Sequence, residues 1–135
     1  MNFDPVLLAP RMEPMKASGL WRDETIARHL ARALQECPGK TAVVAYRQGV
    51  DEPLGLSYRE LDRRAELAAR SLAALGVEHG DVVSYQLPNW WEFVVLVLAC
   101  ARIGAVSNPV MPIFRQHELR FMLNFCESKV FVVPK

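Results

Sequence analysis

Side chains able to act as metal ligands or as an acid–base pair are scattered along this sequence. The three histidines, His29, His79 and His117, never lie three or four residues apart, so no two can share one helix face as metal ligands. Glu60 and Asp62 are two residues apart on an expected helix, and side chains at that spacing point in different directions. We therefore interpret the histidines as surface or cap residues, Glu60 as a helix cap and Asp62 as a solvated charge.

Motifs for a catalytic nucleophile or for nucleotide phosphates are absent from the sequence. No serine lies in a Gly-x-Ser-x-Gly motif. The seven glycines form neither Gly-x-Gly-x-x-Gly nor the Gly-rich loop ending in Lys-Ser or Lys-Thr that cradles phosphates. Gly76 and Gly104 each follow an apolar helical pattern and are interpreted as helix terminators. We assign no catalytic, cofactor-binding or metal-binding residue in this chain.

Two neighbouring tryptophans, Trp90 and Trp91, follow an expected strand, at the sheet edge where α/β proteins bind ligands. One interpretation makes them walls of an apolar acyl pocket. The other, which we favour, makes them core or domain-contact aromatics at a helix start. Residues 108–115 form a second such loop, stiffened by Pro109 and Pro112, and the same two interpretations apply to it.

Composition and charge exclude several classes of function. Hydrophobic residues make up 51% and charged residues 23% of the 135 residues, as in an ordinary globular domain. The formal net charge is only +1, whereas a nucleic-acid reader needs a basic stripe. The longest apolar run, residues 93–101, is about half a bilayer span, and prolines and charges interrupt any signal peptide in the first twenty residues. These features predict a soluble protein without nucleic-acid partners or a transmembrane segment.

The three cysteines, Cys37, Cys100 and Cys126, include no Cys-x-x-Cys pair, and an odd number cannot form a complete disulfide set. Two of them lie within apolar helical patterns, so we interpret them as buried free thiols that behave as small hydrophobes. Free thiols are typical of a reducing compartment, which predicts a cytoplasmic protein.

Hydrophobic periodicity predicts alternating helices and strands after an irregular arm over residues 1–20, which carries three prolines. Apolar residues recur at helical spacing in four segments: 26–37, 57–75, 89–103 and 119–126. β-branched runs predict strands at 41–46, 81–87, 105–110 and 129–134, with a further short strand opening near Leu56. This order predicts an α/β fold with a mainly parallel sheet and flanking helices. We expect residues 21–135 to form one partial domain.

Two of the helix starts carry a capping signature. Ser57 with Glu60, and Asn89 with Glu92, each place a capping side chain three residues before an acidic one. The helix over residues 89–103 is apolar nearly all round, so we expect it to be buried on most sides.

Three stretches carry more specific information than these patterns. They are LSYRELDRRAELAARSLAALGVEHGDVV at residues 56–83, LPNWWEFVVLVLACARIGAVSNPVMP at 87–112 and FRQHELRFMLNFCESKVFVVP at 114–134. In residue identity, order and spacing they resemble the N-terminal segment of AMP-dependent synthetases, the family of acyl-CoA ligases, luciferases and adenylation domains. The resemblance covers residues 25–134, and residues 111–119 are most similar to cyclohexanecarboxylate and medium-chain acyl-CoA ligases.

The resemblance implies the large α/β domain of an adenylate-forming enzyme, with this chain as its incomplete N-terminal part. Such enzymes convert a carboxylic acid and Mg-ATP to an acyl-adenylate, then transfer the acyl group to the thiol of CoA. The family's phosphate-binding loop, ribose ligand and catalytic lysine follow the matched segment, so none is carried over. We expect a full-length ligase of fatty acid metabolism that uses ATP, Mg and CoA, and an inactive chain here that binds no cofactor.

A small stand-alone α/β binding or interaction module is the alternative interpretation. The chain stops after an apolar strand at 130–135, with no helix to cover the second face of that strand, which favours a truncated synthetase. An unpaired strand edge and an apolar patch both recruit partners, so we expect self-association.

Overall fold

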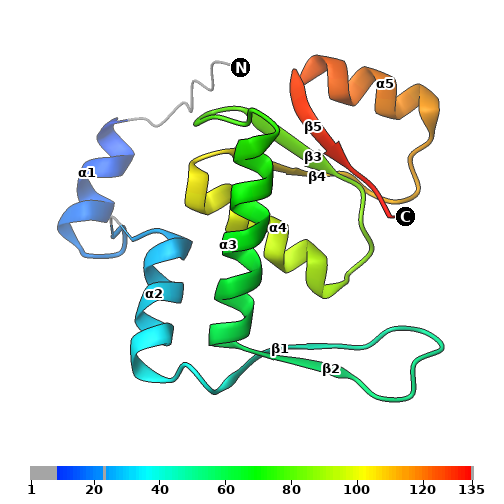
Figure 1. Cartoon of the computed structure of the whole chain (residues 1–135). Helices are drawn as coiled ribbons and strands as arrows, with labels where there is room; N and C mark the ends of the chain where they lie inside the picture. Colours follow the sequence, from blue (N-terminus) through cyan, green and yellow to red (C-terminus); the bar gives the residue numbers. More distant parts are fainter. Residues whose placement is uncertain (1–8, 23, 135) are drawn as a thin grey trace.

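The computed structural model describes residues 9–22 and 24–134. Its elements follow in the order α1 (Ala9–Ala17), α2 (Ile26–Glu36), β1 (Thr41–Ala45), β2 (Leu54–Ser57), α3 (Tyr58–Ala74), β3 (Val82–Tyr85), α4 (Trp91–Ile103), β4 (Val106–Pro109), α5 (Gln116–Phe125) and β5 (Ser128–Val132) (Figure 1). Among these described residues, no helix is both long enough and apolar enough to cross a lipid bilayer.

The central sheet has three parallel strands in the order β4-β3-β5. Val82 at the start of β3 lies opposite Val106 of β4 on one side and Ser128 of β5 on the other. Helix α4 connects β3 to β4 and α5 connects β4 to β5, as parallel pairing requires. The expected α/β fold, with a parallel sheet and flanking helices, is confirmed.

Strands β1 and β2 form a second, separate sheet of two antiparallel strands. Only residues 46–53 connect them, which is too short for the crossover that a parallel pair needs. In Figure 1 this hairpin lies at the lower end of α3, away from the parallel sheet. Both strands were expected from their sequence pattern, and the hairpin adds a separate antiparallel unit to the parallel sheet.

Helix α4 lies at the centre of the core and packs against the parallel sheet, α2 and α3. Ala99 packs with Val83 of β3 in one buried cluster. Leu98 packs with Leu30 of α2 in a second cluster that includes α3 residues. Leu96 belongs to a third cluster near the end of β3. The expectation that the helix over 89–103 is buried on most sides is therefore confirmed.

Of the two expected capping signatures, only the serine half of the one at Ser57 is found, because the Glu60 carboxylate accepts from Arg63 and Arg64 instead. The Ser57 hydroxyl accepts a hydrogen bond from the backbone N–H of Glu60 at 3.2 Å, at the start of α3. The expectation for Asn89 is wrong, because α4 begins at Trp91 and its N-cap is Trp90, which makes no side-chain cap. The Trp90 N–H donates to the carbonyl of Pro88 at 2.7 Å. This turn delays the helix start past Asn89.

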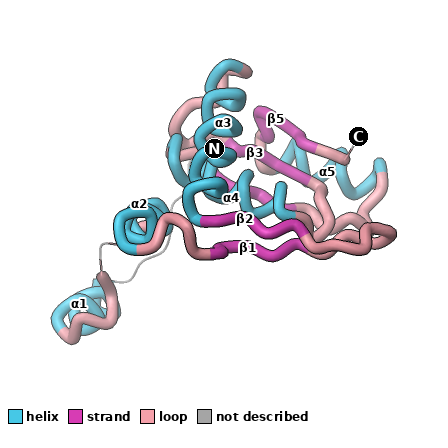
Figure 2. Tube along the Cα trace, turned by 60° about the horizontal axis from the view of Figure 1, so that its bottom comes forward, coloured by secondary structure: helices cyan, strands magenta, loops and turns pink. Residues whose placement is uncertain are grey.

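The prediction of an irregular arm over residues 1–20 is wrong in its second half, because Ala9–Ala17 form helix α1. Residues 1–8 lie outside the described residues. Met, Arg, Glu, Lys and Ala in this segment favour a helix, and Pro10 lies in the first turn, where its missing N–H has no intrahelical partner to lose. Pro14 lies inside the helix and removes one backbone hydrogen bond. Figure 2 shows α1 at the edge of the molecule, beyond α2.

Candidate functional site: a tryptophan-lined groove

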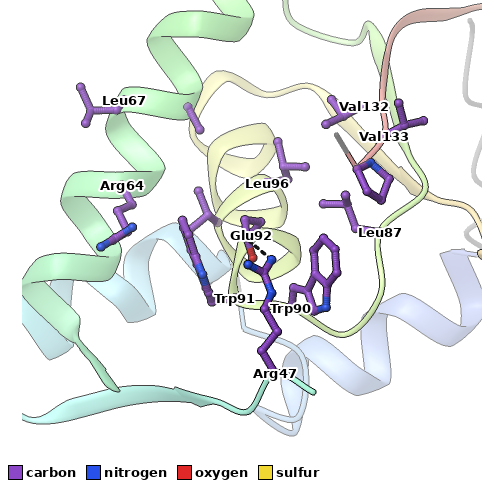
Figure 3. A pocket seen from close by; sticks show the side chains of 13 residues that line it. Arg47, Arg64, Leu67, Leu87, Trp90, Trp91, Glu92, Leu96, Val132 and Val133 are labelled. Carbon is purple, nitrogen blue, oxygen red and sulfur yellow. Dashed lines mark hydrogen bonds and ion pairs between the residues drawn. The ribbon is translucent and has the colours of Figure 1, made fainter. Parts of the chain in front are cut away.

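An apolar hollow lies where β3 and β5 end. After β3 the chain passes Leu87 and enters α4 through Trp90 and Trp91, while Val132 ends the neighbouring strand β5 and Val133 follows it. Carboxyl ends of parallel strands are the usual ligand-binding edge of α/β sheets. The hollow, here called the tryptophan groove, has a volume of about 660 Å³ (Figure 3) and is lined by Arg47, Arg64, Leu67, Ala68, Leu87, Trp90, Trp91, Glu92, Val95, Leu96, Val132, Val133 and Pro134.

Each tryptophan is covered by an arginine from another element. The Arg47 guanidinium lies 4.1 Å from the ring centroid of Trp90, and that of Arg64 lies 4.4 Å from the ring of Trp91. Cation–π contacts at such distances contribute about 0.5–1 kcal/mol each at exposed sites. The two arginines come from the end of the hairpin and from α3, so the stacks join three parts of the fold (Figure 3).

Both arginines are also paired with carboxylates. Arg47 Nη2 lies 3.2 Å from Glu92 Oε1, and Arg64 Nη2 lies 3.0 Å from Glu60 Oε1. Hydrogen bonds from Arg63 and from Arg64 lower the pKa of Glu60, so this carboxylate remains ionised at neutral pH. The positive charges at the groove are thus compensated locally, and its other walls are mainly apolar.

Glu92 leaves one oxygen of its carboxylate unused. Oε1 accepts from Arg47, but Oε2 is buried and has no hydrogen-bond partner among the described residues. A buried acceptor without a donor costs about 1–3 kcal/mol. This acceptor lies beneath the groove wall and has no accessible surface of its own.

A smaller hollow of about 170 Å³ continues the tryptophan groove onto the β1–β2 hairpin. It shares Arg47, Trp90 and Trp91 with the larger one and is lined further by Ala45, Tyr46, Val50, Glu52 and Leu54. Tyr46, Val50 and Leu54 are exposed. The apolar surface therefore runs from the sheet edge across both tryptophans to the hairpin.

The residues that sequence reasoning weighed for acid–base or metal chemistry lie elsewhere in the fold. His29 lies 3.4 Å from Glu24, and the ring of His79 lies against Gly104. Asp62 pairs with Arg102 of α4. Over residues 9–22 and 24–134 no three His, Cys, Asp or Glu side chains gather as a metal site would require.

The segment over 108–115 contributes a polar cluster and also lines a separate hollow of about 310 Å³ beside α5. Asn108 Nδ2 donates to the fully buried Ser84 Oγ at 2.9 Å, and Ser128 Oγ donates to the same oxygen at 2.8 Å. Asn108 Nδ2 also lies 3.4 Å from the sulfur of Cys126. These bonds join β4, β3 and β5 on the sheet face covered by α5. Sequence reasoning missed this cluster, because it depends on which strands are neighbours.

The cysteine thiols are free, as expected. Cys100 is completely buried, and desolvation raises the pKa of its thiol to about 11. It therefore remains protonated at neutral pH and packs as a small apolar residue.

The groove is lined mainly by apolar side chains. Its described lining contains no hydroxyl, thiol or imidazole, and its ionisable side chains are Arg47, Arg64 and Glu92. Trp90 and Trp91 are partly buried and line the groove, a position compatible with both interpretations, pocket walls and contact aromatics.

Comparison with known proteins places these features in a family context. The family described as AMP-binding enzyme matches residues 30–135. The chain is 38% identical to the medium-chain fatty-acid–CoA ligase of Escherichia coli (strain K12), over 92% of this chain and 21% of that protein. It is 36% identical to the 2-hydroxy-7-methoxy-5-methyl-1-naphthoate–CoA ligase of Streptomyces carzinostaticus, over 87% of this chain and 20% of that protein.

A solved structure shares the same fold. The crystal structure of IdnL1 aligns with a TM-score of 0.73 and 26% identity, covering 84% of this chain and 23% of that chain. The present chain thus spans about a fifth of the length of the curated relatives it matches.

Proposed function

The chain belongs to the AMP-binding enzyme family, and we propose that it is the N-terminal part of an ATP-dependent acyl-CoA synthetase. The observation that supports this most strongly is the 38% identity to a fatty-acid–CoA ligase over 92% of the chain. A second relative, at 36% identity, is also a CoA ligase but of an aromatic acid. The activated substrate is therefore a carboxylic acid, joined to CoA at the expense of ATP.

The proposed reaction has two steps. The carboxylate oxygen attacks the α-phosphorus of ATP, releasing diphosphate and forming an acyl-adenylate. The CoA thiol then attacks the acyl carbon, and AMP leaves. Activation of this kind needs donors and a bound Mg ion that neutralise the triphosphate as charge develops.

In this proposal the chain supplies scaffold and no catalytic residue. Residues 21–135 form part of one α/β domain. The arginines of the tryptophan groove are already engaged with carboxylates, so they are poorly suited to hold a triphosphate. We place the protein in the cytoplasm, because its cysteines are free thiols.

An assay of ATP–diphosphate exchange tests the inactivity of the chain by itself. The purified 135-residue chain should give no exchange above a heat-denatured control with medium-chain fatty acids or aromatic acids. Exchange above that control, with contaminating ligase excluded, would show that the chain carries its own catalytic groups.

A chimera tests the assignment to a synthetase. Residues 1–135 would replace the matching segment of the Escherichia coli medium-chain ligase, and formation of acyl-CoA would be measured. We expect measurable activity because the segments are 38% identical. A folded chimera without activity, beside an active parent ligase, would count against the proposed function.

A further inference from the structure

The tryptophan groove leaves an unusual amount of apolar surface open. Leu67 of α3 is 52% exposed and Val133 is 51% exposed, although both line the same hollow. Beyond Trp90 and Trp91, Tyr46 and Val50 extend the apolar surface onto the hairpin. Continuous apolar surfaces of this kind mark sites where another group packs.

The charges at the groove indicate what kind of group fits. Arg47 and Arg64 are each held by a carboxylate, so no free cation awaits a phosphate or a substrate carboxylate at this surface. The unpaired Oε2 of Glu92 is buried by the chain itself and is closed to a partner in the groove. The complementary partner is therefore mainly apolar.

The shape of the surface favours a polypeptide over a compact ligand. The larger hollow alone lies within the range of roughly 300–1,000 Å³ that is typical of small-molecule sites. It continues, however, into a second hollow on the hairpin. At its other end it reaches Val132, which belongs to β5, a strand at the edge of the sheet. An extended or helical segment can follow such a surface, and an open edge can pair with a further strand.

We infer that the tryptophan groove is the docking site for a polypeptide segment from the part of the synthetase that this chain does not span. The chain matches 21% of the length of the Escherichia coli ligase, so about four fifths of such an enzyme lies outside the alignment. The segment is mainly apolar and packs against the two tryptophans, Leu67 and Val133. This inference rests on the proposed function, because that function supplies the partner.

Two matched leucines of α3 and its C-cap provide the test. Leu67 lines the groove, whereas Leu75 does not, and both are exposed, by 52% and 65%. In the isolated chain Leu67→Glu and Leu75→Glu should each melt within about 2 °C of the parent, because both sites are open to water. In the chimera with the Escherichia coli ligase, Leu67→Glu should lower the melting temperature by about 4 °C or more. Leu75→Glu should leave the chimera nearly unchanged.

The stability readout separates this inference from the proposed function. An active chimera that tolerates Leu67→Glu as well as Leu75→Glu would overturn the docking site and leave the function standing. A folded but inactive chimera that Leu67→Glu selectively destabilises would overturn the function and leave the docking site standing.

A binding experiment on the isolated chain covers the case of a chimera that fails to fold. Overlapping synthetic peptides spanning the unmatched part of the Escherichia coli ligase would be probed with the labelled 135-residue chain. We expect binding to a few contiguous apolar peptides, retained by Leu75→Glu and lost in Leu67→Glu. Binding to none of them, or equal binding by both variants, would overturn the inference.

Discussion

The junction between α4 and β4 depends on a single glycine. Gly104 adopts a φ of 72°, in the left-handed region that side chains disfavour, and ends α4 as its C-cap. The following residue, Ala105, donates its N–H to the carbonyl of Cys100 at 2.9 Å. The carbonyl of Gly104 accepts from Gly80 at 2.8 Å, which ties this turn to the one that precedes β3. The glycine thus sets the direction in which the chain enters the sheet.

Gly104→Ala should lower the free energy of unfolding by about 1–3 kcal/mol. A Cβ at this position would overlap the ring of His79, and the positive φ adds backbone strain. Urea unfolding followed by circular dichroism measures the change. Gly39→Ala is the matched control, because Gly39 has no positive φ and no neighbour within 4 Å of its Cβ position. Equal stability of the two variants would contradict this account.

Among the elements, α4 packs against the parallel sheet, α3 and α2. Leu96 packs beside Tyr85 and Leu87 in the cluster next to the tryptophan groove. Leu96→Asp places a charge there without a partner, so we expect a loss of about 3 kcal/mol or more, enough to unfold a marginal domain. Thermal melting provides the measurement, with the exposed Leu75→Asp as control. A Leu96→Asp melt within a degree or so of the parent would mean that α4 is not buried as described.

The contact between α3 and α4 also has a polar part. Arg102 of α4 bridges Asp62 and Glu66 of α3, with 2.7 Å between its Nη1 and Glu66 Oε2. Hydrogen bonds from Arg102 and then from Arg70 lower the pKa of Glu66 from its ordinary value of 4.5. The folded state therefore holds this carboxylate ionised more firmly than the unfolded state does.

This pKa shift predicts how stability changes with acid. A carboxylate whose pKa is lower in the folded state contributes stability that is fully present above the unfolded pKa, 4.5 for Glu66, and is lost as pH falls through the lower folded value. The free energy of unfolding should thus decline as the pH is lowered below 4.5. Glu66→Gln should flatten that decline, whereas Glu36→Gln, an exposed change on α2, should not. If the free energy of unfolding depended on pH in the same way in both variants, the Arg102 bridge would not be the cause of the decline.

Over the whole molecule, apolar surface is open on two sides. The tryptophan groove occupies one side, and α5 with the loop before it occupies another. Around α5 the exposed apolar residues are Met111, Ile113, Phe121 and Phe125, and the last two stack with ring centroids 5.7 Å apart. β4 and β5 are both edge strands of the parallel sheet. Such edges and patches recruit partners when they are left uncovered.

We expect the isolated chain to self-associate, because these surfaces stay open when it is alone. Sedimentation velocity across a concentration series should show a shift to larger species at tens of micromolar. Replacing Phe121 and Phe125 together by Lys should move the distribution toward monomer, since both rings are exposed. A single monomeric species in the parent, with no binding of a dye that reports apolar surface, would favour a complete stand-alone module instead.

The sequence by itself determined which segments become helices and strands, because those choices depend on local spacing. Apolar residues all round 91–103 indicated a buried helix, and Ser57 indicated the start of α3 through a bond to a residue only three positions away. The alternation of helices and strands also indicated a parallel sheet with helices on its faces. Where local signals competed, the pattern failed: it placed the start of α4 at Asn89, and it predicted an irregular arm where Ala9–Ala17 form α1.

Only the tertiary structure decided the candidate site, because its contacts join residues that are distant in sequence. Arg47 donates a hydrogen bond to Glu92, which lies 45 positions away in the sequence, and no local sequence pattern predicts this contact. The cluster around Ser84 likewise requires β3 to lie between β4 and β5, an order that periodicity does not specify. The sequence alone identified the two tryptophans as a feature of interest. They line a groove only because the hairpin, α3 and the end of β5 meet beside them in the folded structure.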